Sequence, residues 1–421
     1  RPAGLKAALL FGVFEMMNLP SSPLDRRHPV WICAMRPFFL LALVCAISLL
    51  CWWGGVLAWG WPVPAVAGGA IVWHAHELVL GLAVAAVAGF ALTALPEFTG
   101  VACGTCRQLR VLVGLWLLVR LGFWASGALG LPALVLAGAS QLALLLGVAW
   151  VLLPALKTAV GRRHWAFAWL VLALAVTSAG FYSDALRGLP GLRWLDATVG
   201  VLMLLIVVAA SRISMRIVNN AIDEITPGAA PYLARPPRRT MAALCIGFYT
   251  GAEFIAPGQP VTGWLGLAAA AAMLNLLNDW HVGRPLWQKR FPALLYAMYW
   301  CMALGYAALG AAQLGWLSGG MSAGRHFLTM GAIGLGIFIV LSIAGRAHVG
   351  RPSDPGPWLG LGGAVLLLAT LWRAIGAVHG VGWPVLAGAA LLWCLAFGIL
   401  AWRVAPGLWL ARTDGKTGCA D

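Results

Sequence analysis

The sequence has 421 residues, of which 62% are hydrophobic and only 10% are charged. Soluble domains carry roughly 25% charged residues, so this composition excludes a soluble protein and predicts an integral membrane protein with short loops. The formal charge of +15 comes from basic residues between apolar segments, which indicates membrane topology and contact with the lipid bilayer and argues against a nucleic-acid partner.

A transmembrane helix needs about 20 mostly apolar residues, and twelve segments of the sequence approach or exceed that length. In chain order they are 38–60, 67–95, 109–128, 132–155, 165–186, 194–218, 240–256, 262–280, 292–316, 324–345, 357–378 and 383–404. The seventh is the weakest because it is short and contains Glu253. We therefore predict an all-α, polytopic integral membrane protein with about 12 transmembrane helices.

Loop charges give the orientation of these segments, because Lys and Arg accumulate on the cytoplasmic side of a membrane. If the N-terminus is cytoplasmic, nearly all of the 28 Lys and Arg residues fall in inner segments. The outer loops then hold only Arg187, Arg193 and Arg325. This bias predicts that both termini are cytoplasmic.

The predicted domain organisation is simple, because the longest loop, at about 217–239, is too short to form a soluble domain. Leu5 to Leu19 is short and amphipathic, which is typical of a helix that lies on a membrane surface. We divide the chain into a cytoplasmic or interfacial segment 1–36, a single twelve-span domain 37–405 and a cytoplasmic tail 406–421.

Histidines stand out at the outer ends of the predicted spans. His74, His76 and Glu77 lie near the outer end of the second span, His326 opens the tenth and His379 ends the eleventh. Ionisable side chains inside a membrane helix are costly, so this outer cluster indicates a functional site. A looser inner group is predicted from His281, His348, Arg212, Arg346 and Tyr296.

The spacing of His74 and His76 limits what they can share. Residues two apart on a regular helix lie roughly 200° apart around its axis, so both cannot face one metal ion. One histidine is then expected to ligate, and the other to serve a second centre or a structural hydrogen bond. Glu77 lies three residues after His74, on the same face, and could orient that ring.

Two kinds of metal centre suit this pattern. A b-type haem buried between helices needs axial histidines from facing helices and basic groups for its propionates, and Arg373 within the eleventh span could supply one such group. Copper also favours imidazole ligands. The alternative is that the histidines form structural hydrogen bonds at an aqueous boundary. Cys103 and Cys106 have CxxC spacing, but one such pair is a weak metal or redox signal.

Several motifs taken together resemble one family. They are Arg36-Pro37-Phe38-Phe39-Leu40, Trp73-His74-Ala75-His76-Glu77, Ala88 to Pro96 with Thr99-Gly100, Ala210-Ser211-Arg212-Ile213 with Asn219-Asn220-Ala221, His326 to Gly334, and Gly345 to Pro352. In this order and spacing the sequence resembles the NnrS family of bacterial membrane proteins. The resemblance extends from Arg36 to about Ala405.

The resemblance implies a multi-pass protein of the bacterial inner (cytoplasmic) membrane that carries haem b and copper and is linked to denitrification and nitric oxide resistance. Its motifs imply metal ligands among His74, His76, His326 and His348. Cofactor-binding residues are expected among Arg36, Glu77, Arg212, Tyr296, Arg346 and Arg373; Arg373 is included for the propionate role.

The sequence departs from the family pattern in three places. Tyr296 stands where the family often has a histidine, although tyrosine can itself ligate haem iron. The segment 210–222 is more polar than usual, and Cys103 and Cys106 do not look like family features.

Three functions are compatible with these observations. The first is an inner-membrane haem and copper protein of nitric oxide metabolism or nitrosative-stress resistance, which binds nitric oxide or a related small ligand or transfers electrons from a donor or respiratory partner. The second is a transporter, because twelve spans with both ends inside is a common transporter layout. The third is a haem-bearing assembly or sensor subunit of a respiratory complex.

Overall fold

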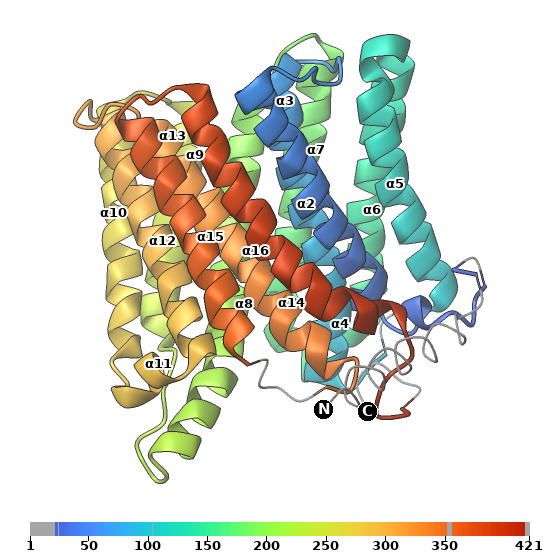
Figure 1. The fold of residues 1–421 in the computed structure, drawn as a ribbon, viewed down its shortest axis with the longest axis vertical. Coiled ribbons are helices and arrows are strands. Elements are labelled where there is room, and N and C mark those ends of the chain that lie inside the picture. The colour runs from blue at the N-terminus through green and yellow to red at the C-terminus, as the bar shows by residue number, and fades with distance from the viewer. Residues whose placement is uncertain (1–21, 24, 103, 352–355, 417–421) are drawn as a thin grey trace, which may run out of the picture.

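The computed structural model describes residues 22–23, 25–102, 104–351 and 356–416, which form helices and connecting loops without a β-strand (Figure 1). The helices of the first half are α2 (Met35–Trp59), α3 (Gly69–His76), α4 (Val84–Thr99), α5 (Cys106–Leu129), α6 (Leu131–Leu156), α7 (Trp165–Leu186) and α8 (Leu192–Ile225). Those of the second half are α9 (Pro236–Ile255), α10 (Pro260–Leu277), α12 (Arg290–Gln313), α13 (Gly320–His326), α14 (Leu335–Ala347), α15 (Pro357–Val378) and α16 (Trp383–Trp409). Short helices are η1 (Pro29–Trp31), η3 (Gly161–His164), η4 (Asn278–Trp280) and α11 (Arg284–Gln288).

The predicted all-α, multi-pass membrane fold is confirmed. Within the described residues, 11 helical segments are long and apolar enough to cross a membrane. The seventh predicted span also forms a helix, α9, which packs between α8 and α10. It is not among the 11 because Arg238, Arg239 and Glu253 make it too polar.

The second and tenth spans are largely enclosed by the others, as is α12. The buried share of the most apolar window is 89% in the second span, Gly69–Thr99, and 67% in both the tenth, Gly320–Ala347, and α12, against 39% in α2. Around them, α5 to α10 pack in chain order, α10 packs on α12, and α15, α16 and α2 complete the wall (Figure 1). The start of α2 and the end of α16 lie at the same end of the bundle, where the buried Arg36 donates a 2.6 Å hydrogen bond to the Leu410 carbonyl oxygen.

The second and tenth spans both contain a π-helical segment directly after a histidine. The segment η2 (Glu77–Ala83) follows His76, and η5 (Phe327–Gly334) follows His326. The π-helix is rare and is found frequently at functional sites. A Cβ atom on Gly81 of η2 would lie 2.6 Å from an Arg120 guanidinium nitrogen. Glycine therefore lets a neighbouring span pack directly onto this widened helix.

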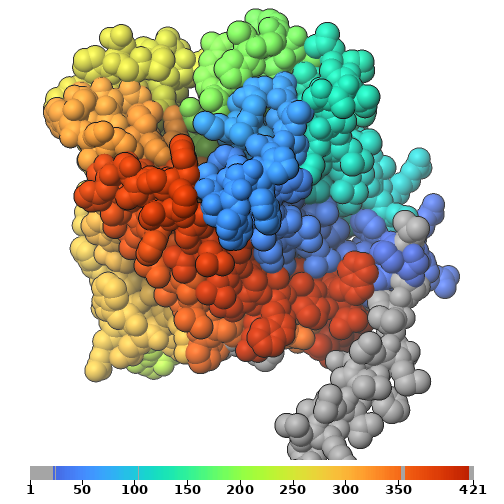
Figure 2. Space-filling model, turned by 45° about the horizontal axis from the view of Figure 1, so that its top comes forward, coloured from blue at the N-terminus to red at the C-terminus, as the bar shows by residue number. Residues whose placement is uncertain are grey.

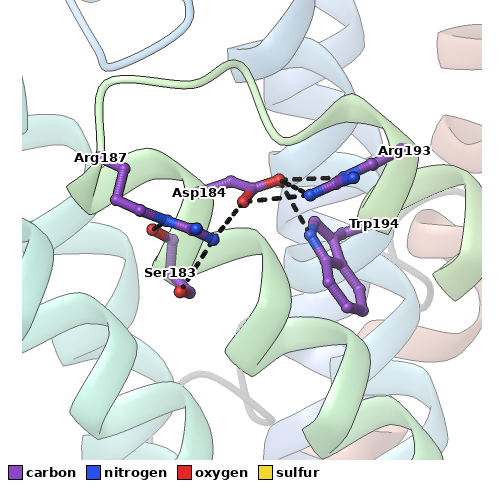
Figure 3. Close-up of polar contacts among 5 residues, drawn as sticks. All are labelled: Ser183, Asp184, Arg187, Arg193 and Trp194. Carbon is purple, nitrogen blue, oxygen red and sulfur yellow. Dashed lines mark hydrogen bonds and ion pairs between the residues drawn. The ribbon is translucent and has the colours of Figure 1, made fainter.

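The three basic residues of the predicted outer side are all paired with carboxylates. Asp184, at the end of α7, accepts hydrogen bonds from Arg187 at 2.7 Å, Arg193 at 3.1 Å and the Trp194 indole at 3.0 Å (Figure 3). Arg325 binds Asp196 at 2.9 Å and Glu253 at 2.7 Å. These three arginines therefore hold helix ends together. Their ion pairs give a structural reason why they lie on the outer side although most Lys and Arg residues lie on the inner side.

Candidate functional site

His74 and His326 come together from the second and tenth spans. His74 lies in α3, and His326 is the last residue of α13. The two histidines are close enough to interact electrostatically with each other, and both interact in the same way with Arg373 of α15. Ser322 links the group, because its hydroxyl accepts a 3.1 Å hydrogen bond from Arg373 and its carbonyl oxygen lies 2.7 Å from His326 Nδ1. The predicted outer pair is thus adjacent in space.

The hydrogen bond from His326 to Ser322 also assigns the histidine tautomer. A carbonyl oxygen only accepts, so Nδ1 of His326 must carry the hydrogen. The other ring nitrogen, Nε2, then has a free lone pair in the neutral ring, as a metal ligand requires. Nε2 has no hydrogen-bond partner among the described residues.

His74 is held by stacking rather than by hydrogen bonds. Its ring lies 4.3 Å from the Trp53 ring at an angle of 19°. In the described part of the chain neither ring nitrogen of His74 has a hydrogen-bond partner, and the side chain is half-buried. Seen with this end forward, the surface is hollowed between the blue α3 region, the green start of α8 and the orange α13 region (Figure 2). His74 therefore keeps both nitrogens available to a ligand.

His76 points to the other side of the helix, as the spacing predicts. Its Nδ1 lies 2.8 Å from Glu77 Oε1 and its Nε2 lies 2.9 Å from the Tyr182 hydroxyl, while the ring stacks on Phe123 at 3.6 Å. Both ring nitrogens therefore have protein partners. Metal ligation by His76 stays a prediction, and it would require Tyr182 to be displaced.

The expectation that Glu77 orients His74 is wrong, because Glu77 contacts His76 instead. Glu77 begins η2, and its carboxylate lies 3.4 Å from Arg120 Nε of α5. Arg120 also donates a 3.0 Å hydrogen bond to the Leu80 carbonyl oxygen inside η2. The ion pair draws Glu77 toward α5, away from His74, and forms a buried polar cluster that we call the His76 network: His76, Glu77, Arg120 and Tyr182.

The predicted inner group is only partly assembled. His348 pairs with Glu97 at 2.5 Å, and both line a cavity of 1490 Å³ together with Arg212. His281 lines a separate cavity of 430 Å³. Tyr296 lines neither cavity and packs among indole rings, 5.8 Å from that of Trp287.

The other predicted residues lie apart from the His74–His326 pair. Arg36 is buried and donates to the carbonyl oxygens of Leu408 and Leu410 at the end of α16. Arg346 is half-buried in the last turn of α14. His379, at the end of α15, is exposed and does not join the outer cluster.

The donor set decides which metal group the outer pair can hold. Within the described residues no three or more His, Cys, Asp or Glu side chains could hold a metal ion together. A pair of histidines instead suits a group that brings its other ligands, and haem does so with four ring nitrogens. Arg373 has a buried NH1 atom without a partner, which suits a carboxylate. The residues present therefore fit a haem.

The cysteines add no metal site in the described part of the chain. Cys106 is free, as are Cys45, Cys51, Cys245, Cys301 and Cys394, and Cys33 is disulfide-bonded. Cys103 lies outside the described residues. The CxxC spacing therefore gains no support as a metal motif.

Sequence reasoning missed several neighbours of these histidines. Trp53 and Tyr182 carry no local signal, because they reach the site from other helices. Arg120 was visible as a charge inside a span, but its partner was not. Ser322 lies one turn before His326, where a helix places its carbonyl oxygen beside that ring.

Comparison with known families finds a match over nearly the whole helical bundle. The family model described as NnrS protein matches residues 29–412, from the start of η1 to just beyond α16. No curated protein matches the sequence. The chain therefore belongs to the NnrS family, and it is a multi-pass membrane protein of the nitric oxide response.

Proposed function

We propose that this protein is a haem and copper protein of the bacterial inner membrane that acts in nitric oxide metabolism or nitrosative-stress resistance. The observation that carries the proposal is the adjacency of His74 and His326, each with an unpartnered ring nitrogen. A polar group enclosed by protein normally finds a partner, so ring nitrogens without a partner on two adjacent histidines indicate that a ligand belongs beside them.

The proposed ligand is a b-type haem, which His74 and His326 would hold through their ring nitrogens. Arg373 would bind a haem propionate, because its unpartnered NH1 atom lies beside the two histidines. Ser322 would keep both groups in place through its hydrogen bonds to Arg373 and His326. Bound there, haem supplies one-electron chemistry and a site for small ligands on iron.

Two histidines that both hold the haem would favour electron transfer as the resting role. Nitric oxide binding would need one of the two side chains to move. His74 is the more mobile candidate in this geometry, because stacking on Trp53 is its main contact, whereas His326 is hydrogen-bonded to Ser322. Nitric oxide is small and apolar, so it can reach the pair through the bilayer without an aqueous channel.

Copper is the second proposed cofactor, and His76 and His348 stay its predicted ligands. Each would have to exchange a protein partner for the metal: Tyr182 for His76, and Glu97 for His348. We also propose an electron donor or respiratory partner, because a haem that transfers electrons needs a source of electrons.

The first experiment is a reduced-minus-oxidised optical spectrum of the purified full chain, expressed with ample haem. We expect a six-coordinate b-type spectrum in the wild type, with bands that shift when nitric oxide is added. His326→Ala and His74→Ala should each lose or alter the bands, whereas the control variant His379→Ala changes an exposed histidine and should leave them unchanged.

The same samples test copper and the competing functions. Metal analysis of His76→Ala and His348→Ala should show which variant loses copper. A colourless wild type would contradict the haem proposal and favour a transporter. Unchanged spectra in both outer variants would move the haem away from the His74–His326 pair.

A further inference from the structure

The inner cavity of 1490 Å³ lies apart from the proposed haem site, although His348, a predicted copper ligand, is one of its lining residues. It lies between the inner ends of α4, α8, α12 and α14, and we call it the inner vestibule. His326 and His348 begin and end one span and are 22 residues apart, which is roughly 33 Å at about 1.5 Å per residue. The vestibule is therefore too far from the outer pair to be part of that site.

One wall of the vestibule is basic. Arg212 and Arg216 lie one turn apart on α8 and both line the cavity. Its two carboxylates already have partners, since Glu97 pairs with His348 and Glu224 pairs with Lys289. Among the described residues no carboxylate pairs with Arg212 or Arg216. Arg212 gives one hydrogen bond to the Arg163 carbonyl oxygen at 2.8 Å, and its Nε atom is buried without a partner.

These arginines lie at the depth of lipid phosphates. Helix α8 begins at Leu192, and Arg212 follows 20 residues later, which is roughly 30 Å at about 1.5 Å per residue. The hydrocarbon core of a bilayer is about 30 Å thick, so Arg212 and Arg216 reach the inner headgroup level. Basic pockets between transmembrane helices on the cytoplasmic side are a known kind of lipid-headgroup site.

The vestibule also has a large apolar surface beside its polar residues, and this surface suits the acyl chains of such a lipid. The apolar lining comes from five different helices and includes Phe39, Phe90, Ile213, Val340, Ile343 and Leu359. A small inorganic anion would fill only a minor part of 1490 Å³ and would leave this surface uncovered. The combination of a basic wall at headgroup depth and an apolar lining calls for an amphiphilic anion.

We propose that the inner vestibule binds one anionic phospholipid, with its phosphate between Arg212 and Arg216 and its acyl chains along the apolar lining. This site is independent of the haem proposal. It would fix the inner ends of α8, α12 and α14 to one another through a bound lipid.

Native mass spectrometry of the delipidated full chain in detergent tests this proposal. Phosphatidylglycerol or cardiolipin, added stepwise, should give one retained lipid per chain, and phosphatidylcholine should bind at least tenfold more weakly. The double variant Arg212→Gln/Arg216→Gln should lose about tenfold or more in affinity for the anionic lipids. The matched control Arg162→Gln/Arg403→Gln removes two exposed charges at the same end, neither of which lines the vestibule, and should bind as the wild type does.

Two further variants separate binding from folding. Arg212→Lys/Arg216→Lys keeps the charge and should retain most of the affinity. Ile343→Trp fills the lining without changing charge and should prevent lipid retention, while the elution profile stays monodisperse. Equal losses in the vestibule and control double variants would show diffuse attraction and overturn the proposal. Displacement of the lipid by millimolar inorganic phosphate would show a free-phosphate site and overturn it as well.

Discussion

Replacement of Glu77 by glutamine is expected to destabilise the bundle strongly, because it breaks a buried ion pair. Glu77 is 1% exposed and binds His76 at 2.8 Å and Arg120 at 3.4 Å. Arg120 is itself 9% exposed, and its Nε and NH2 atoms have no further hydrogen-bond partner. Glutamine has the same shape but no charge, so the Glu77→Gln variant leaves the guanidinium buried without a counter-charge.

The size of the effect follows from these partners. Removing one member of a buried pair costs about 3–5 kcal/mol, because the remaining charge is uncompensated. The glutamine carbonyl can still accept a hydrogen bond from His76, so we expect about 3 kcal/mol, at the lower end of that range. The double variant Glu77→Gln/Arg120→Gln removes both charges and should cost about 2 kcal/mol less than the sum of the single variants.

The measurement is unfolding of the purified protein in mixed micelles with increasing SDS, followed by tryptophan fluorescence. Glu224→Gln is the matched control, because Glu224 pairs with Lys289 but its side chain is 62% exposed, and it should cost less than about 1 kcal/mol. A loss below 1 kcal/mol for Glu77→Gln, or simple additivity in the double variant, would refute the assignment of Glu77 and Arg120 as a buried ion pair.

Three further predictions concern other parts of the bundle. Asp184→Ala should cost about 2–3 kcal/mol in the same unfolding assay, because it removes a buried acceptor of three side chains, whereas Arg187→Ala should cost under about 1 kcal/mol because that side chain is 62% exposed. Gly334→Ala should cost about 1–3 kcal/mol, since a Cβ atom there would lie 2.5 Å from an indole ring of α16; a neutral result would show that η5 can shift. Arg412 donates two hydrogen bonds to Asp414 and lowers the pKa of that carboxyl. The stabilisation by this ion pair is complete above the ordinary Asp pKa of about 3.9 and is lost as pH falls through the lower pKa of Asp414 in the folded protein. Hydrogen exchange of the amides in 410–416, corrected for intrinsic rate, should therefore be constant from about pH 5 to 8 and increase only in stronger acid.

The fold was largely predictable from the sequence because membrane helices depend on local composition. Eleven of the twelve predicted segments meet the length and apolarity required of a span. The exception, 240–256, forms most of α9, but its one charged residue, Glu253, interacts with Arg325 of a neighbouring helix. Local composition cannot show such contacts, so it predicts the helix but not the residues that pair with its side chains.

The site was predictable only where helix depth decides the neighbours. His74 and His326 were placed at the same height by orientation alone, and the structure brings them together. Glu77 was assigned to the wrong histidine because its ion-pair partner, Arg120, comes from another helix and draws the carboxylate toward α5 and His76. His281 and His348 share a depth but line different cavities, since depth says nothing about position around the bundle.

The two histidines of α3 have different partners, and this difference couples the stability of the fold to the geometry of the site. His76 is fixed on one side of the helix by Glu77 and Tyr182, while His74, about half a turn away, makes its main contact with Trp53. Because both side chains belong to one rigid helical turn, the His76 network sets the rotation of α3 and thereby the direction of His74. Tyr182→Phe keeps the ring but removes the hydroxyl that contacts His76, at a cost of about 1 kcal/mol. If rotation is set in this way, that variant should alter the haem spectrum although Tyr182 lies on the side of α3 away from His74. An unchanged spectrum in a destabilised Tyr182→Phe protein would show that the network supports the fold without orienting the ligand.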